Sequence, residues 1–134
     1  AVARQNYKSN LFNTEERLIL LEDAVRCMAN VTVEAFDGLL VDFAKEKGAV
    51  GILRGLRVIT DFEYELQMAQ ANRNLYPEME TLFLCTNVQY SFISSTIVKD
   101  ILRHGGSIQH FVPESAIKII DDIRRNQDGP ADGN

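Results

Sequence analysis

Short apolar segments alternate with longer amphipathic segments along most of this chain, and this alternation limits the folds that it can adopt. AVGIL at 49–53 and TLFLC at 81–85 are continuous apolar runs, as is typical of strands buried in a parallel sheet. The longer segments have helical spacing. Because parallel strands need a crossover connection, usually a helix, this order predicts an α/β fold. We expect a doubly wound parallel sheet with helices on both faces.

Capping signals mark where the helices begin and end. Asn13 and Glu16 are three positions apart, as in an N-terminal capping pair, and Thr60 and Glu63 repeat this spacing before a helix expected over 61–75. The other predicted elements are a strand at 31–36, a helix that ends at Gly48, a helix over 97–104 that ends at Gly105 and Gly106, and a last helix from Pro113.

The length of the chain fits a single domain. A chain of 134 residues can bury a core without disulfide bonds or structural metals. We expect one domain over 1–125, followed by a flexible tail over 126–134. The tail sequence, NQDGPADGN, contains no large apolar residue that would dock on the domain.

Charge and cysteine content argue against several classes of protein. The formal net charge of −5 disfavours broad nucleic-acid binding, which usually needs a basic surplus. No apolar run approaches the roughly 20 residues of a membrane span. Cys27 and Cys85 have neither metal-site nor disulfide-framework spacing, so they are predicted to be buried thiols of a cytoplasmic protein.

Basic residues follow the strand expected at 49–53. Ligands of doubly wound sheets bind beyond the carboxyl ends of the strands, where Arg54, Gly55 and Arg57 occur. Gly55 would let a ligand approach the backbone, and the two guanidinium groups could hold separate anionic groups. Alternatively, both arginines are solvated or pair with carboxylates of the next helix. Those carboxylates are Asp61, Glu63 and Glu65.

The segment YSFISST at 90–96 directly precedes the helix expected over 97–104. A helix N-terminus offers free backbone N–H groups and the positive end of the helix dipole, which together attract anions. Ser94, Ser95 and Thr96 would add hydroxyl donors. The alternative is simple helix capping, which needs one hydroxyl. Three consecutive hydroxyls therefore favour a ligand site.

Lys8 and His104 are weaker candidates. Lys8 could clamp a phosphate, but an ordinary exposed lysine explains it better, and His104 fits a favourable interaction with a helix C-terminus. The sequence contains no Ser-His-Asp order, no metal-ligand spacing and no G-x-x-x-x-G-K-[ST] loop.

Four segments, taken together and in this order, resemble the phosphopantetheine adenylyltransferases, bacterial enzymes of coenzyme A synthesis in the nucleotidyltransferase superfamily. The segments are FDGLLVDFA, LRGLR, DFEYELQMAQANRNLYPEMET and YSFISSTIVKDI. The resemblance extends from Ala1 to about Ile120. It implies a Rossmann-like nucleotidyltransferase fold. It also implies reversible transfer of AMP from ATP to 4′-phosphopantetheine, which gives dephospho-coenzyme A and pyrophosphate.

The resemblance further implies roles for individual residues. Lys8 would contact the phosphates at the reacting centre, which makes it the catalytic candidate, and Lys8, Leu40 and Arg54 would bind phosphopantetheine. The positions implied for ATP are Gly55, Leu56, Arg57, Glu65, Tyr90, Ser91, Phe92, Ile93, Ser94, Ser95 and Thr96. Mg²⁺ would be held mainly by the phosphates of ATP, without a protein ligand. A homo-oligomer, typically a hexamer, is implied, with coenzyme A as a further ligand and no nucleic-acid or membrane partner.

The chain departs from the family pattern at its beginning. Family members start with a strand, a T-F-D-P-x-T-x-G-H loop and a helix, a unit of about 30 residues that has no counterpart after Ala1. We expect this unit to precede Ala1 in the functional protein. Two alternatives remain open: a non-catalytic fragment that binds nucleotide or coenzyme A, and a related nucleotidyltransferase with another acceptor.

Overall fold

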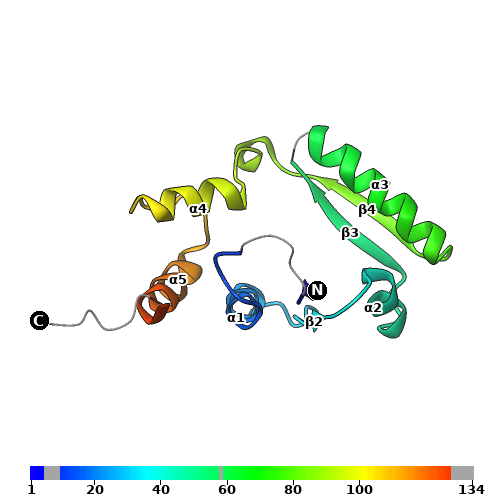
Figure 1. Ribbon diagram of the computed structural model, residues 1–134, viewed down its shortest axis with the longest axis horizontal. Coiled ribbons are helices and arrows are strands. Elements are labelled where there is room, and N and C mark those ends of the chain that lie inside the picture. The colour runs from blue at the N-terminus through cyan, green and yellow to red at the C-terminus, as the bar shows by residue number, and fades with distance from the viewer. Residues whose placement is uncertain (5–9, 58, 128–134) are drawn as a thin grey trace, which may run out of the picture. The chain divides into compact units, whose positions relative to one another are not determined.

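The structure is a computed structural model that describes residues 1–4, 10–57 and 59–127 (Figure 1). Strands and helices alternate in the predicted order, which confirms that prediction. The elements are β1 (Val2–Ala3), α1 (Thr14–Val25), β2 (Ala35–Phe36), α2 (Leu40–Glu46), β3 (Gly51–Leu56), α3 (Ile59–Leu75), β4 (Glu80–Cys85), the 3₁₀-helix η1 (Val88–Tyr90), α4 (Ser95–Arg103) and α5 (Glu114–Gln127).

The chain divides into two compact units. The terminal unit consists of Ala1–Ala35 and Ser94–Asn134, and the middle unit is Phe36–Ile93. Helix α5 ends at Gln127, so it includes the first two residues of the predicted tail. The extent of the single domain expected over 1–125, and of the tail, stays a prediction.

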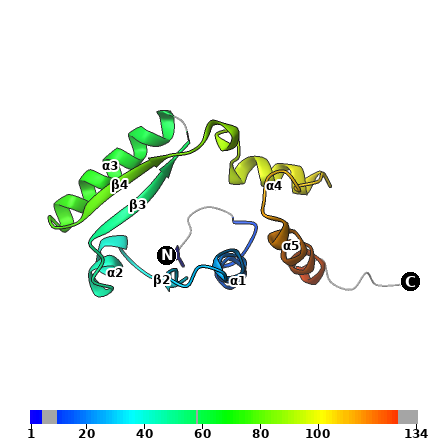
Figure 2. The ribbon, with the colours of Figure 1, turned by 180° about the vertical axis from the view of Figure 1, so that it is seen from behind.

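The middle unit is built on the parallel pair β3 and β4, which confirms the predicted parallel pairing. Leu53 lies opposite Leu82, and Gly55 lies opposite Leu84. Helix α3 runs along the pair, as both ribbon views show (Figures 1 and 2). The Phe62 ring of α3 meets the Phe83 ring of β4 edge to face, with 5.8 Å between ring centroids. One face of this two-stranded sheet is therefore covered by α3.

The opposite face of β3 and β4 carries three exposed leucines. Alternation along the strands places Leu53, Leu82 and Leu84 on this face. Their exposed fractions are 63%, 55% and 57%. The prediction of two fully buried strands is therefore wrong for the described residues. The reason is that α2 and α3 both pack on the other face of the pair.

The core of the middle unit lies between α2, β3 and the segment that leads into β4. Ala44, Ile52 and Met79 are buried together, and Met79 retains only 1% exposure. Leu40 and Tyr76 pack against them. This small cluster attaches α2 to the sheet, so it fixes Leu40 beside β3.

The terminal unit has a core of its own, formed by α4, α5 and the segment between them. Leu102, Ile108, Ala116 and Ile120 are buried in it. Ile120 belongs to α5, the helix predicted from Pro113, and is 4% exposed. Leu102 is the buried residue of α4 and lies near its C-terminal end, so this core holds that end of the helix.

Capping residues and glycines in the sequence predicted several helix ends correctly. The Asn13 side chain accepts a hydrogen bond from the Glu16 N–H at 2.9 Å, and the Glu16 side chain accepts one from the Asn13 N–H at 2.8 Å. This confirms the predicted capping pair. Gly105 has φ +71° after α4 and Gly48 has φ +63° after α2, a conformation that other residues rarely adopt. Both predicted helix stops are confirmed.

Two further expectations differ from the structure. Of the strand predicted over 31–36, only Ala35–Phe36 is a strand. It pairs with β1, and the Val2 N–H donates to the Glu34 carbonyl at 2.8 Å. Cys27 and Cys85 are free thiols and both are exposed. Cys27 lies beyond the end of α1, and Cys85 is the last residue of β4, so neither position is inside a packed core.

Candidate functional site

The carboxyl ends of β3 and β4 meet at one edge of the middle unit. The Thr86 N–H donates to the Leu56 carbonyl at 2.8 Å, which extends the pairing beyond β4. Arg57 directly follows β3, and its Nη1 donates to the Ile93 carbonyl at 3.1 Å. The RGLR segment therefore contacts the end of the loop that follows β4. This is the edge where a parallel α/β sheet places its ligands.

Arg54 is paired with Glu65 of α3. Its Nε donates to one carboxylate oxygen at 2.6 Å and its Nη2 donates to the other at 2.5 Å. The pKa of Arg54 is raised above its ordinary value, chiefly because Glu65 accepts these hydrogen bonds; burial acts in the opposite direction, and the Coulomb attraction of Glu65 adds to the increase. Of the carboxylates left open by the sequence, Glu65 is thus a partner of Arg54. The guanidinium group stays charged.

A cavity of about 130 Å³ lies between β3, β4, α2 and α3. Its lining includes three positions singled out from the sequence: Leu40, Arg54 and Glu65. Leu40 comes from α2, Arg54 from β3 and Glu65 from α3. Residues that are distant in sequence therefore line one cavity. Its wall is mainly apolar and includes the ion pair between Arg54 and Glu65.

Sequence reasoning missed six other residues of this cavity, among them Ile52 of β3 and Ala69 of α3. Tyr64, Met68 and Asn72 come from α3, and Thr81 comes from β4. The spacing of Tyr64, Met68 and Asn72 is i, i+4 and i+8, which places them along one stripe of the helix. This spacing is a usable signal in the sequence, because Glu65 is adjacent to Tyr64 and so lies next to the same stripe.

Gly55 lies on the other face of the sheet from Arg54. A Cβ atom added to Gly55 would meet no described atom within 4 Å, and its φ is outside the left-handed region. The backbone conformation therefore does not require glycine here. The open space beside Gly55 is compatible with the expected approach of a ligand.

The loop after β4 begins with a short 3₁₀ turn. Asn87 caps η1, and the Ser91 hydroxyl donates to the Val88 carbonyl at 2.8 Å. Tyr90 and Phe92 are 53% and 57% exposed. Two aromatic side chains of the predicted ATP segment are thus accessible to a ligand, whereas Ser91 contributes to the turn.

The three hydroxyl residues at the beginning of α4 belong to the terminal unit. The Ser94 hydroxyl accepts a hydrogen bond from the Ile97 N–H at 3.2 Å, so Ser94 is the N-cap. Ser95 and Thr96 are exposed. Ser95 also lines a mainly apolar cavity of about 280 Å³ whose cationic members are Arg17 and Lys99. The Ser94 hydroxyl therefore caps α4. The role of the YSFISST segment in ligand binding stays a prediction.

Replacement of Ser94 by alanine is expected to lower the free energy of unfolding by about 1 kcal/mol, because the Ile97 N–H loses its acceptor. Urea unfolding followed by circular dichroism measures this change. Ser95→Ala is the matched control, since it alters the adjacent serine inside the helix and should change stability by less than about 0.5 kcal/mol. Equal losses in the two variants would contradict the assignment of Ser94 as the cap.

Lys8, the catalytic candidate, lies outside the described residues, as does the side chain of Thr60. Within residues 1–4, 10–57 and 59–127, no group of three or more His, Cys, Asp or Glu side chains could hold a metal ion. No helix in this described part is both long enough and apolar enough to cross a bilayer.

Comparison with known proteins defines the class of this chain. A family model described as cytidylyltransferase-like matches residues 1–101. Its extent includes β3, β4, the RGLR segment and the YSFISST segment. The class is thus a Rossmann-type nucleotidyltransferase fold, in agreement with the predicted α/β fold class.

Similar curated proteins show which family of nucleotidyltransferases the chain belongs to. The chain is 54% identical over 121 residues to a phosphopantetheine adenylyltransferase of Lachnoclostridium phytofermentans, a match that covers 90% of this chain and 74% of the relative. It is 50% identical over 113 residues to that of Alkaliphilus oremlandii, covering 84% and 72% of the two chains. It is 46% identical over 121 residues to that of Thermosynechococcus vestitus, covering 90% and 72%. The chain belongs to the phosphopantetheine adenylyltransferase family.

Proposed function

We propose that this protein transfers the adenylyl group of ATP to 4′-phosphopantetheine, reversibly, and so produces dephospho-coenzyme A and pyrophosphate. The family membership supports the reaction. The observation that carries it for these residues is the convergence of Leu40, Arg54 and Glu65 on one cavity, over the face of the sheet on which α2 and α3 pack. The resemblance assigned Leu40 and Arg54 to phosphopantetheine, so the cavity contains two positions of the acceptor site.

The proposed reaction needs two anionic reactants to be aligned, and it needs no protein nucleophile. A phosphate oxygen of 4′-phosphopantetheine attacks the α-phosphorus of ATP; the new P–O bond forms as the bond from that phosphorus to the oxygen bridging to the β-phosphorus breaks. Pyrophosphate leaves with the electron pair. Cationic groups stabilise such a transition state by offsetting the charge on the phosphate oxygens. Arg54 and Arg57 are the described cations that we assign to this task, and Lys8 is a third.

The described cavity suits only part of phosphopantetheine. Its volume of about 130 Å³ is below the roughly 300 Å³ at which pockets enclose a drug-sized ligand. The apolar wall formed by Leu40, Ile52 and Met68 suits the uncharged arm of the molecule. Arg54 would hold its phosphate, while ATP occupies positions of the RGLR and YSFISST segments.

We propose Mg²⁺ as the cofactor, carried by the phosphates of ATP. Arg54 and Arg57 suit this arrangement, because guanidinium groups bind phosphate oxygens directly. When bound, the ion offsets negative charge on the ATP phosphates. Orientation of the acceptor remains the task of the protein side chains.

The test is an assay of pyrophosphate release. It uses the 134-residue chain and a version extended before Ala1 by the strand, T-x-G-H loop and helix of the family pattern. Pyrophosphate release should require both ATP and 4′-phosphopantetheine. If the extended protein released none, the proposal would be wrong. Ligand binding without turnover would support the non-catalytic alternative, and turnover with a different acceptor would support a related nucleotidyltransferase.

We also propose a homo-oligomer, a hexamer on the family pattern, in the cytoplasm, with coenzyme A as a further ligand and no nucleic-acid or membrane partner. The net charge of −5 supports the absence of nucleic-acid binding. Two exposed free thiols fit a reducing compartment, where they stay unpaired. Mass measurement of the intact complex tests the hexamer.

A further inference from the structure

The ion pair between Arg54 and Glu65 divides the donors of Arg54 into two sets. Glu65 accepts from Nε and Nη2, so both carboxylate oxygens face one edge of the guanidinium plane. The remaining N–H groups, on Nη1 and the far side of Nη2, point away from that carboxylate because the group is planar. They form a second donor edge of the kind that binds a phosphate through two hydrogen bonds.

The two partners differ in how accessible they are. The Arg54 side chain is 43% exposed, whereas the Glu65 side chain is 15% exposed. A ligand in the cavity can therefore reach the guanidinium group more readily than the carboxylate. A carboxylate next to a phosphate is also repelled unless a cation lies between them. Arg54, which is paired with Glu65, would be that cation for a phosphate bound at its second donor edge.

We propose that Glu65 is a positioning residue that orients Arg54 toward the phosphate of the acceptor, rather than a direct ligand of ATP. This inference rests on the proposed function. It reassigns Glu65 from the ATP side, where the resemblance placed it, to the phosphopantetheine side. Glu65 acts through Arg54: it holds one edge of the guanidinium group so that the other edge meets the phosphate in a fixed orientation.

The test compares the affinities of Glu65→Gln for the two substrates. Isothermal titration of the extended protein with 4′-phosphopantetheine should show binding about tenfold weaker than in the unaltered protein, at the low end of the effect of one charged hydrogen bond. Titration with ATP should change by less than about threefold. A direct ATP contact predicts the reverse order, and that result would overturn the inference.

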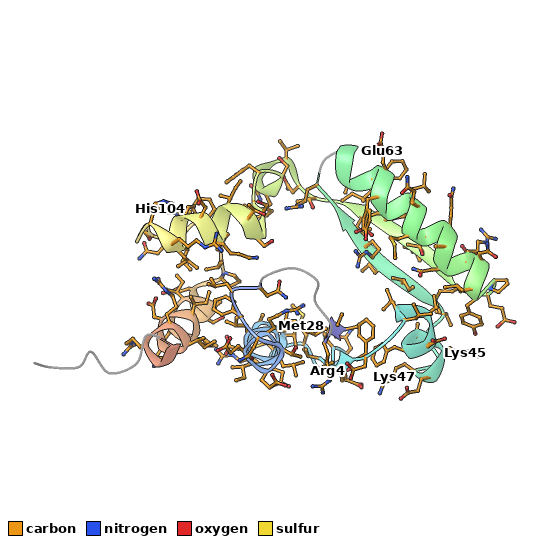
Figure 3. All side chains as sticks on the ribbon, in the orientation of Figure 1. Arg4, Met28, Lys45, Lys47, Glu63 and His104 are labelled. Carbon is orange, nitrogen blue, oxygen red and sulfur yellow. The ribbon has the colours of Figure 1, made fainter. Side chains whose placement is uncertain are left out.

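Glu63→Gln is the matched control. Glu63 is an exposed residue near the beginning of the same helix (Figure 3). The same substitution there should leave both affinities unchanged. Thermal unfolding of both variants separates a loss of affinity from a loss of folding. If Glu65→Gln does not fold, Glu65→Asp is titrated instead; it keeps the charge but shortens the side chain, and it should also weaken phosphopantetheine binding more than ATP binding.

An Arg54→Ala background provides the decisive measurement. If Glu65 acts through Arg54, the double variant Arg54→Ala, Glu65→Gln should bind 4′-phosphopantetheine at least as tightly as Arg54→Ala, because removal of the Glu65 charge also removes its repulsion of the phosphate. A further loss in the double variant would overturn the inference. If the unaltered extended protein bound neither ATP nor 4′-phosphopantetheine, the proposed function itself would fail, a result distinct from the reversed substrate order.

Discussion

Replacement of Arg54 by alanine is expected to weaken 4′-phosphopantetheine binding by about two orders of magnitude. The variant loses charged hydrogen bonds to the phosphate, which contribute about 1.5–3 kcal/mol each, and 1.4 kcal/mol corresponds to a factor of about ten. It also leaves the Glu65 carboxylate, whose side chain is 15% exposed, without this partner beside an anionic ligand. Isothermal titration and the Michaelis constant for the acceptor both measure this effect.

Arg73→Ala is the control for this substitution. Arg73 lies on α3 and pairs with Glu80 at 3.6 Å, and both side chains are more than half exposed. It does not line the cavity that contains Arg54. Its removal should change acceptor affinity by less than about twofold, because exposed ion pairs contribute little. Similar losses in the two variants would show that Arg54 acts only through overall charge.

Replacement of Met79 by alanine is expected to lower the free energy of unfolding by about 2–5 kcal/mol. Met79 is 1% exposed and packs with Ala44 and Ile52, so truncation leaves a cavity where α2 meets β3. Domains are commonly stable by only about 5–15 kcal/mol, so the loss is a large part of the total. Urea unfolding followed by far-ultraviolet circular dichroism provides the measurement.

Met28→Ala is the matched control for Met79, since the same atoms are removed from an exposed site. Met28 is 52% exposed and lies beyond the end of α1 (Figure 3). Its replacement should change stability by less than about 0.5 kcal/mol. If the two methionine variants unfolded at the same urea concentration, the assignment of Met79 to the core of the middle unit would be wrong.

Features set by neighbouring residues could be predicted from the sequence. The capping pair Asn13 and Glu16 and the glycine stops at Gly48 and Gly105 depend on backbone geometry within one turn, and each occurs where its residues indicate. The order of strands and helices follows for the same reason. The family could also be recognised, because several motifs occur in a fixed order.

Features that depend on distant segments could not be predicted in the same way. The apolar composition of TLFLC indicates which side chains favour burial, but the elements that pack on each face decide whether Leu82 and Leu84 are buried. The partner of Arg54 depends on the rotation of α3 relative to β3, which spacing alone does not determine. The roles of individual site residues came from the resemblance and stay predictions.

The contact between Arg57 and the Ile93 carbonyl has a thermodynamic consequence. Together with the bond between Thr86 and Leu56, it ties the loop after β4 to the end of β3 at two points. This loop therefore loses conformational freedom when the chain folds, and not when a nucleotide binds. Association then loses less entropy, so a larger share of each contact energy is retained as affinity.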